Sequence, residues 1–484
     1  MRTQTPSDPK RTDLLSALRT LVAADAVLEA EEERRPYECD GLSAYRQLPM
    51  VVVLPRTVAE VQAILRLCHE RGVPVVARGA GTGLSGGALP HETGVLLSLA
   101  RFQAILEIDP DTRTARLQPG VRNQAISEAV APLGLYYAPD PSSQIACTIG
   151  GNVAENSGGV HCLKYGLTVH NVLKLKVVTM EGELIEIGAD ALDAPGLDLM
   201  ALMIGSEGML GVVVEVTVKL LPLPRSAQVV LAAFDDVGKA GGAVGEIIAA
   251  GIIPAGLEMM DGPAIKAAED FVHAGYPVDA AAILLCEVDG IEEEVIEQIA
   301  RVSALLSDCG ATAVRAARNE EERLGFWKGR KAAFPAVGRI SPDYYCMDGT
   351  IPRRRLPEVL QRTAELSQQY GLRVANVFHA GDGNLHPLIL YDANNPGELE
   401  RTEALGGAIL ELCVAVGGTI TGEHGVGIEK INQMCVQFTP EELEQFRRVK
   451  RAFDPQELLN PGKGIPTPRR CSEYRTLPTQ AVRS

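Results

Sequence analysis

The sequence contains no uninterrupted apolar run of about 18 residues, the length that a membrane-spanning helix requires. Even its Gly/Ala-rich stretch over residues 241–256 is interrupted by Glu246 and Pro254. The opening segment, MRTQTPSDPKRTD, is polar and contains Pro6 and Pro9, so it lacks the apolar core of a signal peptide and the amphipathic helix of a transit peptide. We therefore expect a cytoplasmic protein whose chain does not itself span a membrane.

Closely spaced cysteines are missing as well. The ten cysteines are scattered, and even the nearest pair, Cys147 and Cys162, is far from the CxxC spacing that holds zinc or an iron–sulfur cluster. We expect most of them to be buried, reduced and inert. If the chain carries a redox cofactor, its electrons must leave to an acceptor that the chain does not contain.

Basic residues are too few for a polyanion-binding surface. The chain has 46 Lys and Arg against 62 Asp and Glu, a formal net charge of −16, which argues against binding to nucleic acid or anionic lipid. An anionic ligand therefore needs a locally positive pocket. With 484 residues, 46% of them hydrophobic, the chain can bury the cores of roughly two to four domains.

Helical and strand patterns are mixed along the chain and predict an α+β protein. A polar, helix-leaning segment over residues 12–33 precedes a strand over 51–55. Residues 57–72 predict an amphipathic helix with Thr57 as N-cap, Glu60 in the capping box and Gly72 as its end. β-branched runs between Gly-rich turns predict further strands at 73–78, 172–180, 183–188 and 212–220.

The segment LPLPRS (221–226) interrupts this pattern with Pro222 and Pro224 and marks a domain boundary. Beyond it, residues 227–399 predict an α+β cap, and the remainder is mostly helical up to LNPGKGIP (459–466). We therefore expect four parts: an N-terminal helical segment (1–48), a ligand-binding domain (49–226), a cap with a helical C-terminal part (227–466) and a tail (467–484).

A glycine-rich loop, GAGTGLSGGA (79–88), follows a predicted strand. Its glycines allow the backbone to approach a pyrophosphate and to point N–H groups at it. The loop contains a literal G-x-G-x-x-G that starts at Gly81, the fingerprint of a dinucleotide-binding Rossmann unit. That unit needs a helix directly after the glycines, whereas Pro90 and Gly94 follow here and GVLLSL predicts a strand. We expect a phosphate cradle between strands, not a nicotinamide site.

Two histidines lie in a predicted β-hairpin. VANVFHAGDGNLHPLIL (374–390) consists of two alternating runs joined across Asp382-Gly383, a strong signal for a type I′ turn. If these two residues form the loop, His379 lies directly opposite His386 on one face, with Cβ atoms about 4.5–5.5 Å apart. Two imidazoles at that separation can share one metal ion.

A third histidine lies in TGEHGVG (421–427), where Glu423 and His424 are neighbours. Adjacent side chains in an extended chain point in opposite directions, so one can complete a His/His/carboxylate site while the other faces a substrate. With mixed N/O ligands the ion would be zinc, with manganese or iron(II) as the next choices. The alternative is that the three side chains act only as hydrogen-bonding groups.

Two further Gly/Asn-rich stretches, 138–159 and 204–218, suit a cofactor too long for one loop. With the glycine loop from Arg78 to Ala88, they make residues 40–466 resemble the vanillyl-alcohol-oxidase-type flavoproteins, specifically the branch of the FAD-linked glycolate oxidase subunits and D-lactate dehydrogenases. The resemblance implies a two-part FAD-binding domain (49–226), an α+β substrate cap and a helical C-terminal segment. It also implies non-covalent FAD, since the histidine to which several relatives attach their flavin is missing from this loop.

The resemblance further implies which residues contact FAD. The glycine loop would hold the pyrophosphate, residues 139–157 would line the path from the adenosine to the ribityl chain, and residues 207–213 with Asn460 would complete the site. The implied residues are Arg78, Gly79, Ala80, Gly81, Thr82, Gly83, Leu84, Ser85, Gly86, Gly87, Pro139, Asp140, Ser142, Thr148, Gly151, Asn152, Ser157, Glu207, Gly208, Gly211, Val212, Val213 and Asn460.

Chemical roles follow from the same resemblance. Glu423 would bind a metal with His379 and His386, and His424 would remove the substrate's hydroxyl proton as the C2 hydride passes to the flavin. Arg330, in FWKGRKAAFPAVGR (326–339), would bind the substrate carboxylate, for which a planar guanidinium is suited.

The substrate implied is a small 2-hydroxy monocarboxylate. Relatives that act on dicarboxylic hydroxy acids carry a lysine near YYCMDGTIP (344–352), where this chain has Cys346 and Met347. The run Arg353–Arg355 follows Pro352 and is expected to be a solvated patch.

We therefore predict FAD-dependent oxidation of glycolate, and of D-lactate, to the 2-oxo acid. The resemblance implies that electrons pass to a complex with a second FAD-type subunit and an iron–sulfur subunit, which would hold the chain peripherally at the inner membrane. Two alternatives stay open: a stand-alone D-lactate dehydrogenase of the same fold, and a flavin-free metal-binding scaffold subunit.

Overall fold

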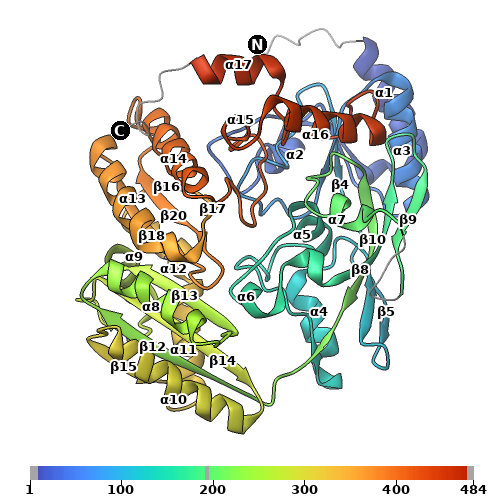
Figure 1. The fold of residues 1–484 in the computed structure, drawn as a ribbon. Helices are drawn as coiled ribbons and strands as arrows, with labels where there is room; N and C mark the ends of the chain where they lie inside the picture. The colour runs from blue at the N-terminus through green and yellow to red at the C-terminus, as the bar shows by residue number, and fades with distance from the viewer. Residues whose placement is uncertain (1–8, 191–195, 477–484) are drawn as a thin grey trace.

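The computed structural model describes residues 9–190 and 196–476, so the polar opening before Pro9 and the last part of the predicted tail lie outside the described residues. The described chain forms two lobes that lie side by side in Figure 1. The first lobe ends with β11 (Leu221–Pro222), which pairs with β7 (Leu135–Tyr136), and the cap begins with β12 (Ser226–Phe234). Helices and sheets are mixed in both lobes, which confirms the α+β class.

Two larger sheets build the first lobe, in addition to the pair of β7 and β11. One has the order β1-β2-β4-β3, with β4 parallel to both of its neighbours, and the other is antiparallel with the order β5-β6-β10-β8-β9. The strands are β1 (Val27–Leu28), β2 (Val51–Val53), β3 (Val75–Arg78), β4 (Val95–Ser98), β5 (Ile105–Asp109), β6 (Thr114–Leu117), β8 (Val172–Val178), β9 (Leu184–Gly188) and β10 (Val212–Lys219). The helices are α1 (Pro9–Leu21), α2 (Glu31–Arg34), α3 (Val58–Arg71), α4 (Asn123–Val130), α5 (Ile149–Glu155), α6 (Cys162–Tyr165) and α7 (Leu199–Met203).

The helix predicted over 57–72 is confirmed, whereas the one over 12–33 is too long. In α3, Thr57 and Glu60 form the capping box, and Gly72 ends the helix in the left-handed region at φ 62°. By contrast α1 stops at Leu21, because Val27 and its neighbour are taken into the first sheet as β1, opposite β2. Leu18 of α1 lies in the same core as the strands of that sheet, so the N-terminal segment packs on the first lobe.

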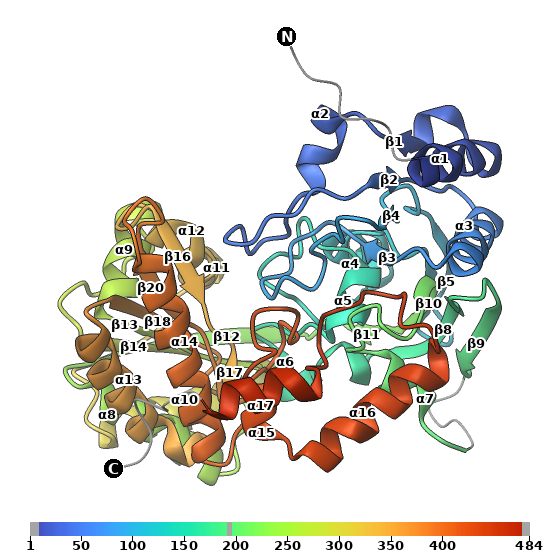
Figure 2. The same ribbon diagram turned by 90° about the horizontal axis from the view of Figure 1, so that it is seen from above.

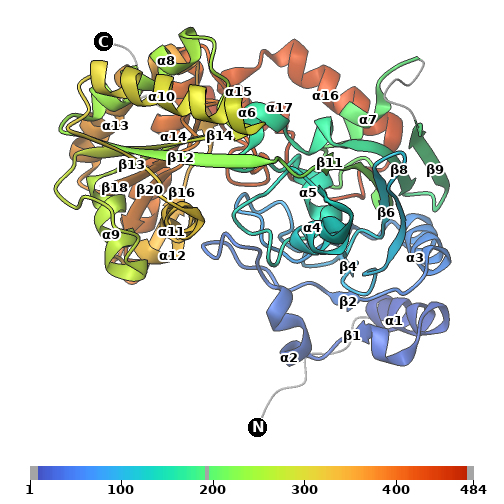
Figure 3. The same ribbon diagram turned by 90° about the horizontal axis from the view of Figure 1, so that it is seen from below.

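A seven-stranded antiparallel sheet forms the centre of the cap, in the order β15-β12-β14-β13-β18-β20-β16. Helices α8, α10, α13 and α14 pack against one face and α9, α11 and α12 against the other (Figures 1 and 3). The remaining strands are β13 (Gly256–Asp261), β14 (Ala282–Gly290), β15 (Ala313–Ala316), β16 (Asp343–Cys346), β17 (Gly349–Thr350), β18 (Arg373–Phe378), β19 (Asn384–Leu385) and β20 (Pro387–Tyr391). The helices are α8 (Val237–Ala249), α9 (Gly262–Val272), α10 (Glu292–Asp308), α11 (Glu320–Lys331), α12 (Ala333–Val337), α13 (Leu356–Tyr370) and α14 (Glu398–Ala415).

The predicted register of the histidine hairpin is wrong by two residues. His379 pairs with Asn384, not with His386, and the loop between them spans residues 380–383. Contacts outside the hairpin hold this loop: the Gly381 N–H donates to the Leu257 carbonyl in β13, and the Ile351 N–H donates to the Gly383 carbonyl. A shift of two residues keeps both histidines on one face of the sheet.

The C-terminal part leaves the cap and returns to the first lobe. Its helices are α15 (Met434–Gln437), α16 (Pro440–Phe453) and α17 (Pro468–Thr476), and Figures 2 and 3 place α16 beside α7. Leu459, which follows α16, forms a parallel bridge with Val75 of β3. None of the described helices has the length and apolarity to cross a bilayer.

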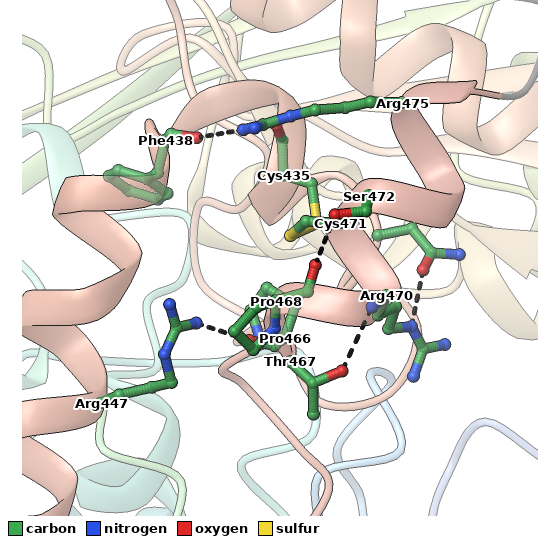
Figure 4. The surroundings of a disulfide bond; sticks show 11 residues. Cys435, Phe438, Arg447, Pro466, Thr467, Pro468, Arg470, Cys471, Ser472 and Arg475 are labelled. Atoms are coloured by element: carbon green, nitrogen blue, oxygen red, sulfur yellow. Dashed lines mark hydrogen bonds between the residues drawn. A yellow bond between two sulfur atoms is a disulfide. The ribbon is translucent and has the colours of Figure 1, made fainter.

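Most of the cysteines are free, as expected, and the exception is one disulfide. Eight of the ten are free, but Cys435 in α15 and Cys471 in α17 form a disulfide that their wide spacing in the sequence did not suggest (Figure 4). The Arg475 guanidinium reinforces this junction by donating to the carbonyl oxygens of Cys435 and Phe438. The disulfide therefore ties the start of the predicted tail to the body of the protein.

Candidate functional site

A cavity of about 650 Å³ lies where the glycine loop of the first lobe meets the cap. From the first lobe it is lined by the loop from Arg78 to Leu84 and by residues of α5 and of the segment 206–213. His386, Glu423 and His424 also line it. A cavity of this size suits a ligand as large as a dinucleotide, with three titratable side chains in its lining.

Sterics explain why glycine occupies two positions of this loop. A Cβ at Gly79 would collide with the Thr148 Oγ1, and one at Gly81, whose φ is +70°, would collide with the Arg78 guanidinium. The Thr148 Oγ1 is buried and has no hydrogen-bond partner among the described residues, so it is available to a ligand. No helix follows the loop before β4, which confirms that this is not a Rossmann turn. The cradle therefore fits the pyrophosphate part of FAD.

Most of the residues implied for FAD line the cavity. They are Arg78, Gly79, Ala80, Gly81, Thr82, Gly83, Leu84, Gly87, Ser142, Thr148, Gly151, Asn152, Ser157, Glu207, Gly208, Gly211, Val212 and Val213.

Five others lie behind this lining and shape it. Asn460 donates from Nδ2 to the carbonyl oxygens of Gly87 (2.9 Å) and Glu207 (2.6 Å). The carbonyl of Ser85 accepts from the Ile428 N–H at 3.0 Å, which joins the glycine loop to the chain that follows His424. The five residues are Ser85, Gly86, Pro139, Asp140 and Asn460.

The three histidines converge on one carboxylate. The Glu423 Oε1 lies 3.3 Å from the His379 Nε2, 3.0 Å from the His386 Nε2 and 3.7 Å from the His424 Nε2. The ring of His386 stands at 87° to that of His379, with centroids 5.0 Å apart, and stacks on that of His424 at 4.9 Å. The structure thus brings together four side chains that lie up to 45 positions apart in the sequence, and nitrogen and oxygen atoms of His379, His386 and Glu423 lie within 4.8 Å of one another.

A second carboxylate, Glu258 of β13, was not anticipated from the sequence. Both of its oxygens lie 2.9 Å from the His379 Nδ1, and its Oε2 lies 2.6 Å from the Arg330 Nη2. Burial opposes a charge on His379, but the charges of Glu258 and Glu423 on either side raise its pKa well above the ordinary value. Burial likewise acts to raise the pKa of Glu423, and the histidines outweigh it, so that pKa lies well below the ordinary value.

Arg330 does not line the cavity. Its side chain is fully buried behind Glu258, and its Nε and Nη1 have no hydrogen-bond partner among the described residues. A cation of the cap that does line the cavity is Lys331, whose Nζ lies 3.6 Å from the Asp140 Oδ2. Phe334 also lines it, with its ring 5.9 Å from that of His386. Lys331 and Phe334 both lie in the segment 326–339, and their nearness to Arg330 in the sequence was the signal that marked them as site residues.

The pKa of His424 is shifted in the opposite direction from that of His379. Burial lowers the pKa of His424 from 6.5 to about 4, so the imidazole is neutral near pH 7. Its Nδ1 is buried and has no hydrogen-bond partner among the described residues. A neutral imidazole in the cavity lining can accept a proton, although it is a weaker base than the ordinary histidine value suggests.

Glu207 also makes contacts that the sequence did not suggest. Its carboxylate accepts from the N–H groups of Val426 and Gly427, both at 2.7 Å, and its backbone has a positive φ of 51°. The residue lines the cavity, but its carboxylate connects the first lobe to the loop that carries His424.

Two family descriptions match the chain: "FAD binding domain" over residues 49–188 and "FAD linked oxidases, C-terminal domain" over residues 223–464. The chain is 68% identical to the glycolate oxidase subunit GlcD of Escherichia coli (strain K12), over 97% of this chain and 94% of that protein. It is 41% identical to GlcD of Bacillus subtilis (strain 168), over 89% and 92%. It is 35% identical to D-lactate dehydrogenase of Archaeoglobus fulgidus, over 86% and 91%.

Solved structures are similar in fold. A p-cresol methylhydroxylase with substrate bound matches with a TM-score of 0.80 at 17% identity, covering 95% of this chain and 97% of that chain. The 4-ethylphenol oxidase of Gulosibacter chungangensis matches with a TM-score of 0.79 at 18% identity, covering 96% and 98%. At these identities the likeness concerns the fold alone.

Proposed function

The chain belongs to the FAD-linked oxidases, within them to the group of the glycolate oxidase subunit GlcD, and we propose on that premise that it oxidises glycolate, and also D-lactate, to the 2-oxo acid. It is an FAD-dependent oxidoreductase. The observation that carries the proposed substrate class is the position of neutral His424 beside His386 and Glu423, in the same cavity as the phosphate cradle.

His424 acts as the general base in this proposal. When bound, FAD supplies the two-electron acceptor for the hydride that leaves C2 of the substrate. The imidazole of His424 takes the hydroxyl proton, and Phe334 and the cap sheet exclude water from this part of the cavity. The stacked His386 ring limits the rotation of His424, so its lone pair stays directed at one place.

The substrate carboxylate needs a cation, and we assign it to Arg330. Its Nη2 is paired with the Glu258 Oε2, but none of its three guanidinium nitrogens has a hydrogen-bond partner among the described residues, and buried N–H donors without acceptors are costly. Lys331, which lines the cavity, is the alternative cation against which the assignment of Arg330 is tested. Cys346 and Met347 add no second cation in this region, which favours a monocarboxylate.

A divalent metal fits the cluster and forms a finer part of the proposal. His379, His386 and Glu423 would hold it, because two imidazoles and a carboxylate form a donor set that suits zinc and, less well, manganese or iron(II). Glu258 beside the His379 Nδ1 is the kind of outer carboxylate that orients a ligating imidazole. A bound ion would lower the pKa of the substrate hydroxyl. Elemental analysis of the purified protein before and after chelation tests this assignment.

The electron acceptor lies outside the chain in this proposal. The sequence has no iron–sulfur spacing, so we infer a partner with an iron–sulfur cluster, together with a second FAD-type subunit, and a peripheral place at the membrane through them. The second candidate function is a stand-alone D-lactate dehydrogenase, which the 35% identity to the Archaeoglobus fulgidus enzyme favours. The test of that candidate is turnover of the isolated chain with D-lactate and an artificial dye, which would support it.

The decisive experiment is anaerobic mixing of the purified protein with glycolate, D-lactate and D-2-hydroxyglutarate, followed at the flavin absorbance band. Bleaching by the two monocarboxylates but not by the dicarboxylate is expected. His424→Ala should retain FAD and lose bleaching, whereas His91→Ala, a histidine outside this cavity, should behave as wild type. Bleaching by D-2-hydroxyglutarate alone, or normal bleaching of His424→Ala, would contradict the proposal.

A further inference from the structure

We propose that Asp348 is the positioning residue that holds Glu423 and His424 in their working orientation. The residue lies between β16 and β17 of the cap and does not line the cavity, so it can act only through the loop around it. The inference rests on the proposed roles of Glu423 and His424.

The Asp348 carboxylate is wrapped by three consecutive backbone N–H groups. Its Oδ2 accepts from the Gly422 N–H at 3.0 Å and from the His424 N–H at 2.9 Å. The Glu423 N–H lies 3.1 Å from Oδ1 and 3.2 Å from Oδ2. Successive N–H groups that converge on one anion form a nest, a conformation that is held by the anion itself.

Side chains complete the enclosure of this carboxylate. The Thr421 hydroxyl donates to Oδ2 at 2.7 Å, and the Asn384 amide donates to Oδ1 at 2.9 Å. The Lys430 Nζ lies 3.3 Å from Oδ2 and donates to the Gly425 carbonyl at 2.8 Å. Asp348 and Lys430 are both fully buried, so solvent does not weaken the ion pair.

This geometry fixes where the two functional side chains point. Because the N–H groups of residues 422–424 face the buried anion, the side chain of Glu423 is left to reach His379 and His386, and that of His424 stacks on His386. Backbone pairing also anchors the chain just before this loop. Thr350, which ends β17 just after Asp348, forms an antiparallel bridge with Thr419. Asp348 thus holds the loop on the cap, while Glu207 holds its later residues on the first lobe.

Asp348→Asn is the sharpest test, because it keeps the shape and removes the charge and one acceptor. FAD content should be unchanged. The rate constant of flavin reduction by glycolate in anaerobic single-turnover experiments should fall by about 100-fold, the effect of a small misplacement of a catalytic group, while the glycolate concentration at half-saturation changes little. Thr421→Val removes the hydroxyl's hydrogen bond to Oδ2 and its contact with the Gly425 carbonyl at 3.0 Å but leaves the Asp348 charge in place. This variant should give a smaller fall, and it replaces Asp348→Asn as the test if that variant does not fold.

Two controls separate positioning from general loss of structure. Asp261→Asn removes a buried carboxylate of the same lobe, which caps α9 through the Ala264 N–H and accepts from Asn376, and should lower the melting temperature without slowing reduction. The double variant Asp348→Asn/His424→Ala should be slower than His424→Ala by well under 100-fold, because only the part of the Asp348 effect that passes through Glu423 remains.

The outcomes discriminate between the two claims. If His424→Ala reduces its flavin slowly but Asp348→Asn does so at the wild-type rate, the positioning role is overturned and the proposed base is not. Rate losses that multiply fully in the double variant would also overturn the positioning role. Normal reduction of His424→Ala would overturn the proposed base and the positioning role together.

Discussion

His161 offers the most quantitative prediction, because it joins the two lobes through charge. Its Nδ1 lies 2.9 Å from the Asp140 Oδ2 in the first lobe, and its Nε2 lies 3.5 Å from the Glu287 Oε1 in β14 of the cap. Burial by itself lowers the pKa of His161, but the charges and hydrogen bonds of Asp140 and Glu287 outweigh it and raise the pKa to about 10. The histidine is therefore cationic at neutral pH in the folded protein.

The effect on stability follows from the difference between the folded pKa and the ordinary value of 6.5. A difference of about 3.5 corresponds to about 5 kcal/mol at 1.36 kcal/mol for each pH unit. Asp140 and Glu287 keep Lys331 and Arg323 as other partners, so we expect about half of this figure. The stabilisation is fully present below about pH 6.5 and is lost as the pH rises toward 10, with about 1–1.5 kcal/mol lost between pH 7 and pH 9.

The assay compares wild type with His161→Gln in urea unfolding at pH 7, 8 and 9. The fluorescence of Trp327, the only tryptophan, is a suitable signal because its ring lies 5.8 Å from that of His161 and its Nε1 donates to Glu287. His161→Gln should be less stable by about 2 kcal/mol at pH 7, and the gap should narrow at pH 9. His91→Gln, in the first lobe, should stay parallel to wild type over this range.

A constant gap between wild type and His161→Gln from pH 7 to pH 9 would refute the reasoning. It would mean that His161 is neutral in the folded protein and that its contribution comes from packing and neutral hydrogen bonds.

Three further predictions concern the loop, the disulfide and the substrate cation. Gly81→Ala should lower FAD affinity at least about tenfold, because its Cβ collides with Arg78. Gly72 also has a positive φ but has open space around it, so Gly72→Ala should cost only about 1 kcal/mol of stability and leave FAD content unchanged. Cys471→Ser should lower the free energy of unfolding by about 3–4 kcal/mol, since the disulfide closes a separation of 36 residues. In thermal unfolding, wild type treated with reductant should behave like Cys471→Ser. Arg330→Met should raise the glycolate concentration needed for half-maximal flavin reduction by about 10- to 100-fold with FAD retained, and an equal effect of Lys331→Met alone would move the carboxylate site to Lys331.

Features that depend on near neighbours in the chain were predictable. Helix α3 follows from its capping box and Gly72, and the phosphate cradle follows from five glycines with no room for a helix behind them. The two-part FAD-binding fold and the FAD dependence were predicted from the resemblance to a flavoprotein family, and the short Gly-rich stretches of the sequence carry that resemblance.

Where His379, His386, Glu423 and His424 stand relative to one another was only partly predictable. The hairpin pattern placed both strand histidines on one face, but the turn was set by hydrogen bonds of Gly381 to the Leu257 carbonyl and of the Ile351 N–H to Gly383, whose partners are remote in sequence. The register therefore slipped by two residues, and only the period of two in a strand preserved the shared face.

The sequence by itself thus determined the fold class, the FAD cradle and the identity of the histidine set, because these follow from local spacing. Tertiary structure alone decided the partners behind that set. Glu258 and Asp348 lie 121 and 76 positions from the histidines that they hold, and no local pattern marks them. The low pKa of His424 and the disulfide of Cys435 have the same origin, since burial and pairing depend on which distant segments the folded chain brings together.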